Sequence, residues 1–205
     1  PPVSGQIGPG LTVLTGASGA GKSTFLGVLA GLVRPGETAS VTGSLTGVPD
    51  SLAFADQSPR FFTSTVGEEL RLFGGSEIDT AALKQRAALD LDDAAAVDAL
   101  SPGEARRLSL ARAFARVDSG AQLLIVDEPT AHLDDASAAR IRRELQTISE
   151  TCPVIAASHD PVLTEAGTRL HIGAPARDLD AVEPAADPVE SNTRPNLDEG
   201  AEDVR

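Results

Sequence analysis

The chain has 205 residues, which is enough for one domain with a sizeable core, or for a domain that carries an additional lobe. Its formal net charge of -13 argues against a non-specific nucleic-acid binder, because the surface would repel nucleic-acid phosphates. The single cysteine excludes an internal disulfide, and no apolar run reaches the roughly 18 residues of a membrane-spanning helix.

The first predicted elements are a short buried strand over residues 11–15 and a helix over residues 23–32. Between them, residues 16–24 read Gly-Ala-Ser-Gly-Ala-Gly-Lys-Ser-Thr and match the phosphate-loop pattern G-x-x-x-x-G-K-S/T at every fixed position. The motif requires a strand-to-helix junction, and the sequence predicts one here. A nucleoside triphosphate is therefore the first ligand to consider.

The residue types of this loop suit the binding of phosphate groups. Glycines permit a backbone that turns its N–H groups inward, and the helix N-terminus adds a partial positive charge. Lys22 is expected to reach the β- and γ-phosphates, and the Ser23 hydroxyl is expected to bind Mg²⁺. The predicted nucleotide-binding residues of the loop are Gly16, Ser18, Gly19, Ala20, Gly21, Lys22, Ser23 and Thr24.

Two later strands are expected to end at the same edge of a parallel sheet. Residues 123–127 form an apolar run that ends in Asp127 and is followed by Glu128, and residues 153–157 lead to His159. Asp127 would hold Mg²⁺, and Glu128 would be the general base that activates the attacking water. A neutral His159 would hydrogen-bond the γ-phosphate, although the alternative of His159 as base, oriented by Glu128, stays open.

The ordered series of motifs resembles that of the ATP-binding-cassette (ABC) ATPases over about residues 10–172. Residues 54–57 are similar to the family's Q-loop, and the resemblance implies that Gln57 reaches Mg²⁺ and the water. The sequence Leu-Ser-Pro-Gly-Glu at 100–104 resembles the signature loop L-S-G-G-Q and precedes a basic, apolar helix over 105–116. The stretch after the acidic pair resembles the D-loop with Asp134, and His159 matches the switch histidine.

This resemblance implies an α/β fold with a P-loop NTPase core, a mostly parallel sheet flanked by helices, and an inserted helical lobe. It also implies hydrolysis of ATP with Mg²⁺ at a head-to-tail dimer interface, in a homodimer or a heterodimer. Ser101 and Gly103 of one nucleotide-binding domain would close the nucleotide site of the second. The other implied partner is the transmembrane domain of a transporter, which would place the chain at the cytoplasmic face of the cell membrane.

Two residues of the signature loop depart from the family pattern. Pro102 lacks a backbone N–H and fixes φ, so the Ser101 side chain and the Gly103 N–H remain to contact the γ-phosphate. Glu104 replaces the usual glutamine, which is a milder change. Together with the sequences around His132 and His159, these features resemble actinobacterial cassettes of the thiol-exporter type linked to cytochrome bd assembly.

The stretch between the Q-loop and the signature resembles the family's helical lobe, expected over about residues 60–112. Residues 80–100 are rich in alanine and leucine and predict a helix by propensity. Phe61 and Phe62 have two alternative roles. Adjacent phenylalanines are usually core residues, but these lie where the coupling helix of a membrane domain would bind.

The two ends of the chain carry separate expectations. Residues 1–172 are expected to form the nucleotide-binding domain, and the acidic, apolar-poor residues 173–205 are expected to be disordered. The start at Pro1 and the absence of Met suggest a domain excised from a longer exporter-type chain. Two alternative functions stay open, a soluble ABC-type ATPase and a nucleotide-gated binding module that hydrolyses little, although the presence of Glu128 favours hydrolysis.

Overall fold

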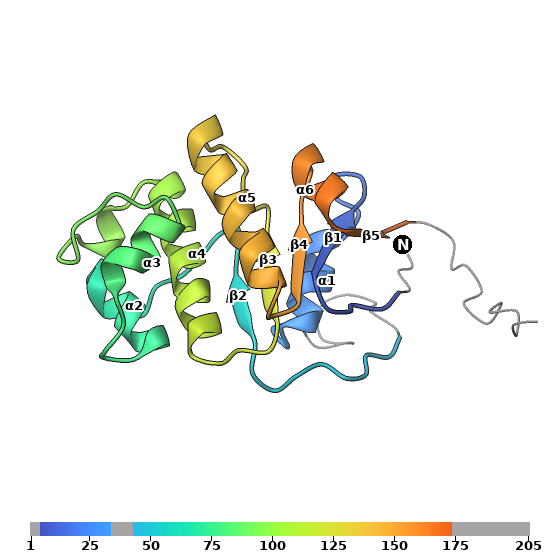
Figure 1. The fold of residues 1–205 in the computed structure, drawn as a ribbon, viewed down its shortest axis with the longest axis horizontal. Coiled ribbons are helices and arrows are strands. Elements are labelled where there is room, and N and C mark those ends of the chain that lie inside the picture. The colour runs from blue at the N-terminus through green and yellow to red at the C-terminus, as the bar shows by residue number, and fades with distance from the viewer. Residues whose placement is uncertain (1–4, 34–42, 174–205) are drawn as a thin grey trace, which may run out of the picture.

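The computed structural model describes residues 5–33 and 43–173, which form a parallel sheet with helices packed around it (Figure 1). Within these residues the sheet has five strands in the order β2-β3-β4-β1-β5, and every neighbouring pair is parallel. The strands are β1 (Leu11–Thr15), β2 (Ala53–Ala55), β3 (Leu124–Asp127), β4 (Val154–Ala157) and β5 (Thr168–His171). The predicted α/β class with a mostly parallel sheet is therefore confirmed.

The central strands are buried on both faces, because their residues alternate between two apolar clusters. One cluster includes Val13, Val126 and Ala156 with Ile141 and Leu145 of the helix α5 (Asp135–Ser149). The other includes Leu14, Ile125 and Ile155 with Leu26 of the helix α1 (Lys22–Leu29). The helices α5 and α1 thus cover opposite faces of the sheet. The carboxyl ends of the strands remain at one edge, where connecting loops can form a binding site.

The other four helices of the described residues lie in two places around the sheet. Figure 1 shows α2, α3 and α4 gathered beside β2, whereas α6 lies beyond β4. The helices are α1 (Lys22–Leu29), α2 (Val66–Gly74), α3 (Thr80–Arg86), α4 (Pro102–Asp118), α5 (Asp135–Ser149) and α6 (Pro161–Ala166), with a 3-10 turn at Val97–Ala99. The group of α2, α3 and α4 lies where an inserted helical lobe is expected.

Elements near the phosphate loop occur as predicted, with small shifts at their ends. β1 has the predicted bounds, and β3 and β4 each begin one residue later than expected. The helix predicted over 23–32 ends already at Leu29, because Gly31 adopts a φ of +70° and the Leu32 N–H donates to the Gly27 carbonyl at 2.8 Å. The helix predicted over 105–116 is longer and extends over 102–118.

The helix predicted over residues 80–100 is wrong beyond Arg86. Ala88 has a φ of +54°, so the backbone turns away from the helix axis there. Farther along, the chain pairs with the segment before α2, where the Val66 N–H donates to the Ala95 carbonyl at 3.0 Å. Tertiary contacts therefore override the helix propensity of these alanines.

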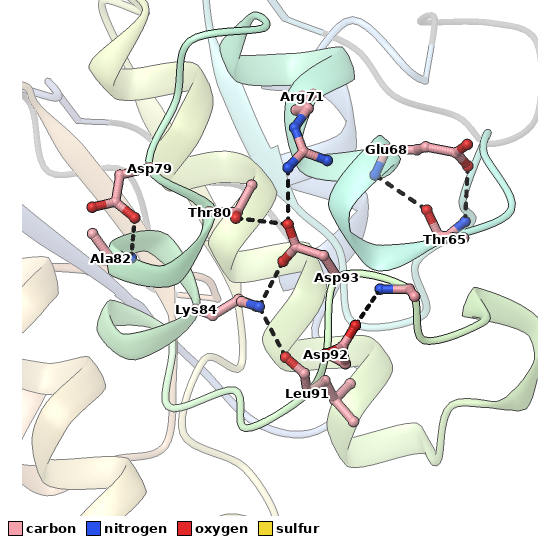
Figure 2. A network of polar contacts seen from close by, with 11 residues as sticks. Thr65, Glu68, Arg71, Asp79, Thr80, Ala82, Lys84, Leu91, Asp92 and Asp93 are labelled. Carbon is pink, nitrogen blue, oxygen red and sulfur yellow. Dashed lines mark hydrogen bonds and ion pairs between the residues drawn. The ribbon is translucent and has the colours of Figure 1, made fainter.

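A single carboxylate, Asp93, holds this segment as a loop. It accepts hydrogen bonds from Arg71 (2.9 Å), Thr80 (2.8 Å) and Lys84 (2.6 Å), as Figure 2 shows. Lys84 also donates to the Leu91 carbonyl at 2.9 Å. The hydrogen bond from Lys84 is the main cause that lowers the pKa of Asp93. These donors come from α2 and α3, so the loop is tied to both helices.

The pair Phe61 and Phe62 splits between the two roles predicted for it. Phe61 packs against the core, but Phe62 is 72% exposed, so the core interpretation is wrong for Phe62. The fully buried Glu69 accepts hydrogen bonds from the backbone N–H groups of Phe62 (3.0 Å) and Thr63 (3.1 Å). Arg112 of α4 donates to Glu69 at 2.8 Å. This buried ion pair fixes the segment that presents Phe62 to solvent.

The predicted ends of the domain lie partly beyond what the structure describes. Of the tail expected to be disordered, residues 173–205, all but Gly173 lie outside the described residues. Among the residues that are described, no helix is long and apolar enough to cross a membrane. The limits of 1–172 for the domain and 60–112 for the lobe stay predictions.

Candidate nucleotide-binding site

The phosphate loop connects the end of β1 to the start of α1 at the open edge of the sheet. Gly21 precedes α1 with a φ of +96°, a conformation that favours glycine. A Cβ on Gly16 would lie 3.0 Å from the carbonyl oxygen of Ile172. α1 has no side-chain cap and no acidic residue in its first turn. Its first backbone N–H groups and partial positive charge therefore suit an anion.

Lys22 brings this loop into contact with the segment after β4. Its Nζ donates to the carbonyl oxygens of Gly16 (3.0 Å) and Ala17 (3.3 Å) and lies 3.0 Å from Nε2 of His159. The Lys22 side chain is buried, and none of these three partners is a carboxylate. Its positive charge is thus left for a phosphate group, as the phosphate-loop motif predicts.

Asp127 ends β3 and is almost completely buried. Burial raises the pKa of this carboxyl group and the nearby Asp56 acts in the same direction, whereas Ser23 and Lys22 oppose the shift. A buried carboxylate beside a serine hydroxyl provides the oxygen ligands that Mg²⁺ prefers. In the described parts of the chain no three His, Cys, Asp or Glu side chains gather into a metal cluster. Water and phosphate oxygens would supply the remaining ligands.

Glu128 and His159 stand side by side at the ends of β3 and β4. Oε1 of Glu128 lies 3.6 Å from Nε2 of His159, which is too long for a direct hydrogen bond. Glu128 has an unusual φ of +49°, and its N–H donates to the Ala157 carbonyl at 2.9 Å. The carboxylate is therefore held at the sheet edge beside the imidazole.

A buried carboxylate next to this pair was missed by sequence reasoning. Asp160 accepts hydrogen bonds from Thr130 Oγ1 (2.8 Å) and Arg142 Nε (2.7 Å). Burial alone would raise the pKa of Asp160, but the hydrogen bonds from Arg142 and Thr130 outweigh it and hold the pKa below its ordinary value. An acidic residue before Pro161 is a signal for a helix start, yet nothing in the sequence reveals its other partners.

The Q-loop and the D-loop meet through one arginine of α4. Gln57 is exposed in the loop after β2, and its carbonyl accepts a hydrogen bond from Arg106 at 3.5 Å. Arg106 also donates to the Ala131 carbonyl at 2.9 Å, a role that sequence reasoning missed. Asp134 caps α5 by accepting hydrogen bonds from the N–H (2.9 Å) and hydroxyl (2.7 Å) of Ser137, and these bonds lower its pKa.

The signature residues lie at the start of α4. Ser101 caps this helix, and its N–H (2.9 Å) and hydroxyl (2.6 Å) both donate to the Glu104 carboxylate. Pro102 occupies the first helical position, where a missing N–H costs no helix hydrogen bond. Among the described residues, no hydrogen bond joins Ser101, Gly103 or Asp134 to the phosphate loop. The structure thus brings together Lys22, Glu128 and His159, but not the signature.

Comparison with known proteins adds to this geometry. A family model described as ABC transporter matches residues 2–131, which include the phosphate loop, the signature loop and the acids after β3. The chain belongs to the ABC transporter family. Residues 2–131 thus carry the ATP-binding cassette of this family.

Several curated proteins share this ABC cassette. The cytochrome c biogenesis ATP-binding export protein CcmA of Paracoccus denitrificans is 42% identical over 135 residues, which cover 63% of this chain and 60% of CcmA. CcmA of Brucella abortus is 35% identical over 193 residues, 87% of this chain and 86% of that protein. The glutathione/L-cysteine transport system ATP-binding/permease protein CydC of Bacillus subtilis is 34% identical over 166 residues, 71% of this chain and only 29% of CydC.

Solved ABC structures share the fold. The dimeric ATP-binding cassette MJ0796, bound to ADP and Pi in a post-hydrolysis state, matches with a TM-score of 0.64 and 22% identity, over 82% of this chain and 85% of that chain. A bacterial Atm1-family ABC exporter with ATP bound matches with a TM-score of 0.63 and 24% identity, over 80% of this chain and 32% of that chain. The fold is that of an ABC cassette.

Proposed function

We propose that this cassette binds and hydrolyses ATP to power an ABC membrane transporter. The observation that carries the proposal is the meeting of Lys22, Glu128 and His159, with His159 Nε2 3.0 Å from the Lys22 ammonium and 3.6 Å from the Glu128 carboxylate. The three side chains come from the first residue of α1 and from the ends of β3 and β4. Residues far apart in sequence are thereby gathered at one edge of a parallel sheet, where ligands bind in such folds.

Each of these side chains has a part in hydrolysis. Lys22 exchanges its carbonyl partners for oxygens of the β- and γ-phosphates, which are stronger acceptors because they are charged. The Glu128 carboxylate accepts a proton from a water molecule, whose oxygen attacks the γ-phosphorus while the bond to the β–γ bridging oxygen breaks. His159 hydrogen-bonds the γ-phosphate and orients the water. The products are ADP and inorganic phosphate.

The metal and the rest of the nucleotide are assigned to neighbouring residues. Bound Mg²⁺ neutralises charge on the phosphates. The residues that would hold it are Ser23, Gln57 and Asp127. The remaining nucleotide contacts of the loop are assigned to Gly16, Ser18, Gly19, Ala20, Gly21 and Thr24.

A second nucleotide-binding domain completes the site in a head-to-tail dimer. Ser101, Gly103 and Asp134 of each cassette would face the nucleotide that the other cassette holds. The hydrogen bonds of the Ser101 and Asp134 side chains stay within their own helices, which leaves this surface unconnected to the phosphate loop of the same chain. The dimeric state of MJ0796 supports this arrangement.

The partner outside the cassette is the transmembrane domain of a transporter, which places the chain at the cytoplasmic face of the membrane. A hollow of about 410 Å³ lined by Phe62, Phe73, Leu32 and Arg112 would receive a coupling helix of that domain. The two phenylalanine rings lie 6.1 Å apart. Phe62 and Leu32 are 72% and 67% exposed and line the same hollow, and neighbouring exposed apolar side chains of this kind mark interaction surfaces.

The relatives support two features of this transporter. CydC is an ATP-binding/permease protein of which the chain covers 29%, and this supports a domain excised from a longer exporter, including the thiol-transporting type. The Brucella CcmA, an ATP-binding export protein, is covered over 86% of its length, which supports a role in export.

The experiment that tests hydrolysis replaces Glu128 by Gln. We expect ATP affinity to persist while the single-turnover rate falls by roughly 10²- to 10⁴-fold, because the general base is lost. Glu165→Gln, an exposed change in α6, is the matched control and should hydrolyse at the parental rate. If Glu128→Gln also hydrolyses at the parental rate, the base is another group. A parent protein that binds ATP without turnover would instead be a nucleotide-gated binding module.

A further inference from the structure

Asp160 directly follows the exposed His159, yet its own side chain is only 4% exposed. Its Oδ1 accepts hydrogen bonds from the backbone N–H groups of Val162 (2.9 Å) and Leu163 (3.4 Å), which caps α6. Its Oδ2 accepts hydrogen bonds from Thr130 and Arg142. Each oxygen of this carboxylate therefore binds two donors, and the two oxygens serve different parts of the chain.

The cap explains only one of the two oxygens. A serine or asparagine would cap α6 equally well, because a cap needs a single acceptor. The second oxygen reaches segments that follow Glu128 in the chain, since Thr130 lies two residues after it and Arg142 belongs to α5. Asp160, the residue beside His159, is thus linked through its carboxylate to the turn that carries Glu128.

The backbone at Glu128 requires such support. A φ of +49° is uncommon for a residue other than glycine and persists only where neighbouring contacts hold it. Two backbone hydrogen bonds hold this conformation. The Glu128 N–H donates to the Ala157 carbonyl, and on the other side of the turn the Ala131 N–H donates to the Glu128 carbonyl at 3.3 Å. Thr130 lies inside this turn, so the Asp160 carboxylate fixes it from the β4 side.

We propose that Asp160 is a positioning residue for ATP hydrolysis, which holds the Glu128 turn at a fixed separation from His159 through Thr130 and Arg142. This inference rests on the proposed role of Glu128. Lys22 and the phosphate loop make no contact with the Asp160 carboxylate among its hydrogen bonds. Loss of the carboxylate therefore displaces the base and leaves nucleotide binding in place.

The test compares Asp160→Asn, Thr130→Val and Thr130→Ser. The asparagine keeps one oxygen for the cap but turns an N–H₂ donor toward Arg142, and the valine removes the Thr130 hydroxyl at nearly constant shape. We expect the single-turnover rate at saturating ATP to fall roughly 10- to 100-fold in the first two variants, since a displacement of about 1 Å can cost about 10²-fold. The ATP dissociation constant should change less than about threefold, and Thr130→Ser should restore the parental rate.

Thr164→Val is the matched control, because the Thr164 hydroxyl donates to the backbone carbonyl of Asp160 at 2.8 Å and does not touch the carboxylate. It should hydrolyse at the parental rate. Parental rates in both Asp160→Asn and Thr130→Val, measured beside an inactive Glu128→Gln, would overturn the inference, and so would an equal loss of rate and affinity. If Asp160→Asn does not fold, the comparison of Thr130→Val with Thr130→Ser decides. An active Glu128→Gln would reject the proposed base instead.

Discussion

The ammonium nitrogen of Lys22 lies 3.0 Å from Nε2 of His159. An ammonium group can only donate, so a hydrogen bond across this contact requires the imidazole nitrogen to accept. The same ammonium also holds the Gly16 and Ala17 carbonyls, and a bound triphosphate must replace at least one of these neutral acceptors. The contact therefore links nucleotide binding to the position of His159.

Replacement of Lys22 by Ala should weaken ATP binding. A hydrogen bond to a charged group contributes about 1.5–3 kcal/mol, which corresponds to a loss of affinity of roughly 10- to 100-fold. Calorimetric titration with MgATP measures it. Lys84→Ala is the control, because Lys84 pairs with Asp93 in the helical lobe and should leave the affinity unaltered. Unchanged binding by Lys22→Ala would contradict the assignment of the phosphate loop.

Replacement of Pro102 should strengthen the ATP-dependent dimer. At the start of α4, Pro102 has no N–H and the Glu104 N–H donates to Ser101, so the Gly103 N–H is the donor left for a phosphate. Pro102→Gly and Pro102→Ala each restore one donor, and the alanine separates this effect from added backbone freedom. In a Glu128→Gln background with ATP, sedimentation should show more dimer for both variants than for the Pro102 form. Equal association, or a tighter dimer with Pro102, would indicate that the signature is built for a different partner.

Replacement of Arg112 by Ala should destabilise the fold. Glu69 is fully buried, and loss of its partner leaves an uncompensated charge that costs about 3–5 kcal/mol. Urea unfolding measures the change in the free energy of unfolding. Arg71→Ala removes an ion pair whose arginine is 46% exposed, and it should cost less than about 1 kcal/mol. If both variants lose a similar free energy of unfolding, the buried Arg112–Glu69 pair stabilises the fold no more than an exposed pair does.

The hydrogen bonds on Asp160 predict a pH dependence of stability. Burial raises the pKa of Asp160, but the hydrogen bonds from Arg142 and Thr130 lower it by more. The pKa in the folded state therefore lies below the unfolded value of about 4. The ionised carboxylate thus stabilises the fold above that value, and the contribution is lost as the pH falls through the folded-state pKa. The difference in unfolding free energy between parent and Asp160→Asn should be steady from about pH 7 to 5 and shrink below about pH 4. Thr164→Val removes no ionisable group, so its difference from the parent should not follow this curve.

The central strands and the residues at their ends could be predicted because the signals are local. A glycine-rich loop with Lys22 needs a strand before it and a helix after it, and apolar runs that end in Asp127 or His159 indicate buried parallel strands. The loop around Asp93 could not be predicted, because its alanines favour a helix and the donors that hold it come from other elements. The partners of Asp160 were hidden for the same reason.

The strand order has a consequence for synthesis of the protein. β1 is made first, but among the residues that the structure describes its strand partners are β4 and β5, for example Leu11 with Val154 and Val13 with Arg169. A nascent chain that has emerged from the ribosome up to α5 can pair β2 with β3, while β1 still lacks both neighbours. Such non-local pairing is slow and leaves an apolar strand open to misassembly. The phosphate loop that follows β1 can therefore take its final place only after residues 154–171 have left the ribosome.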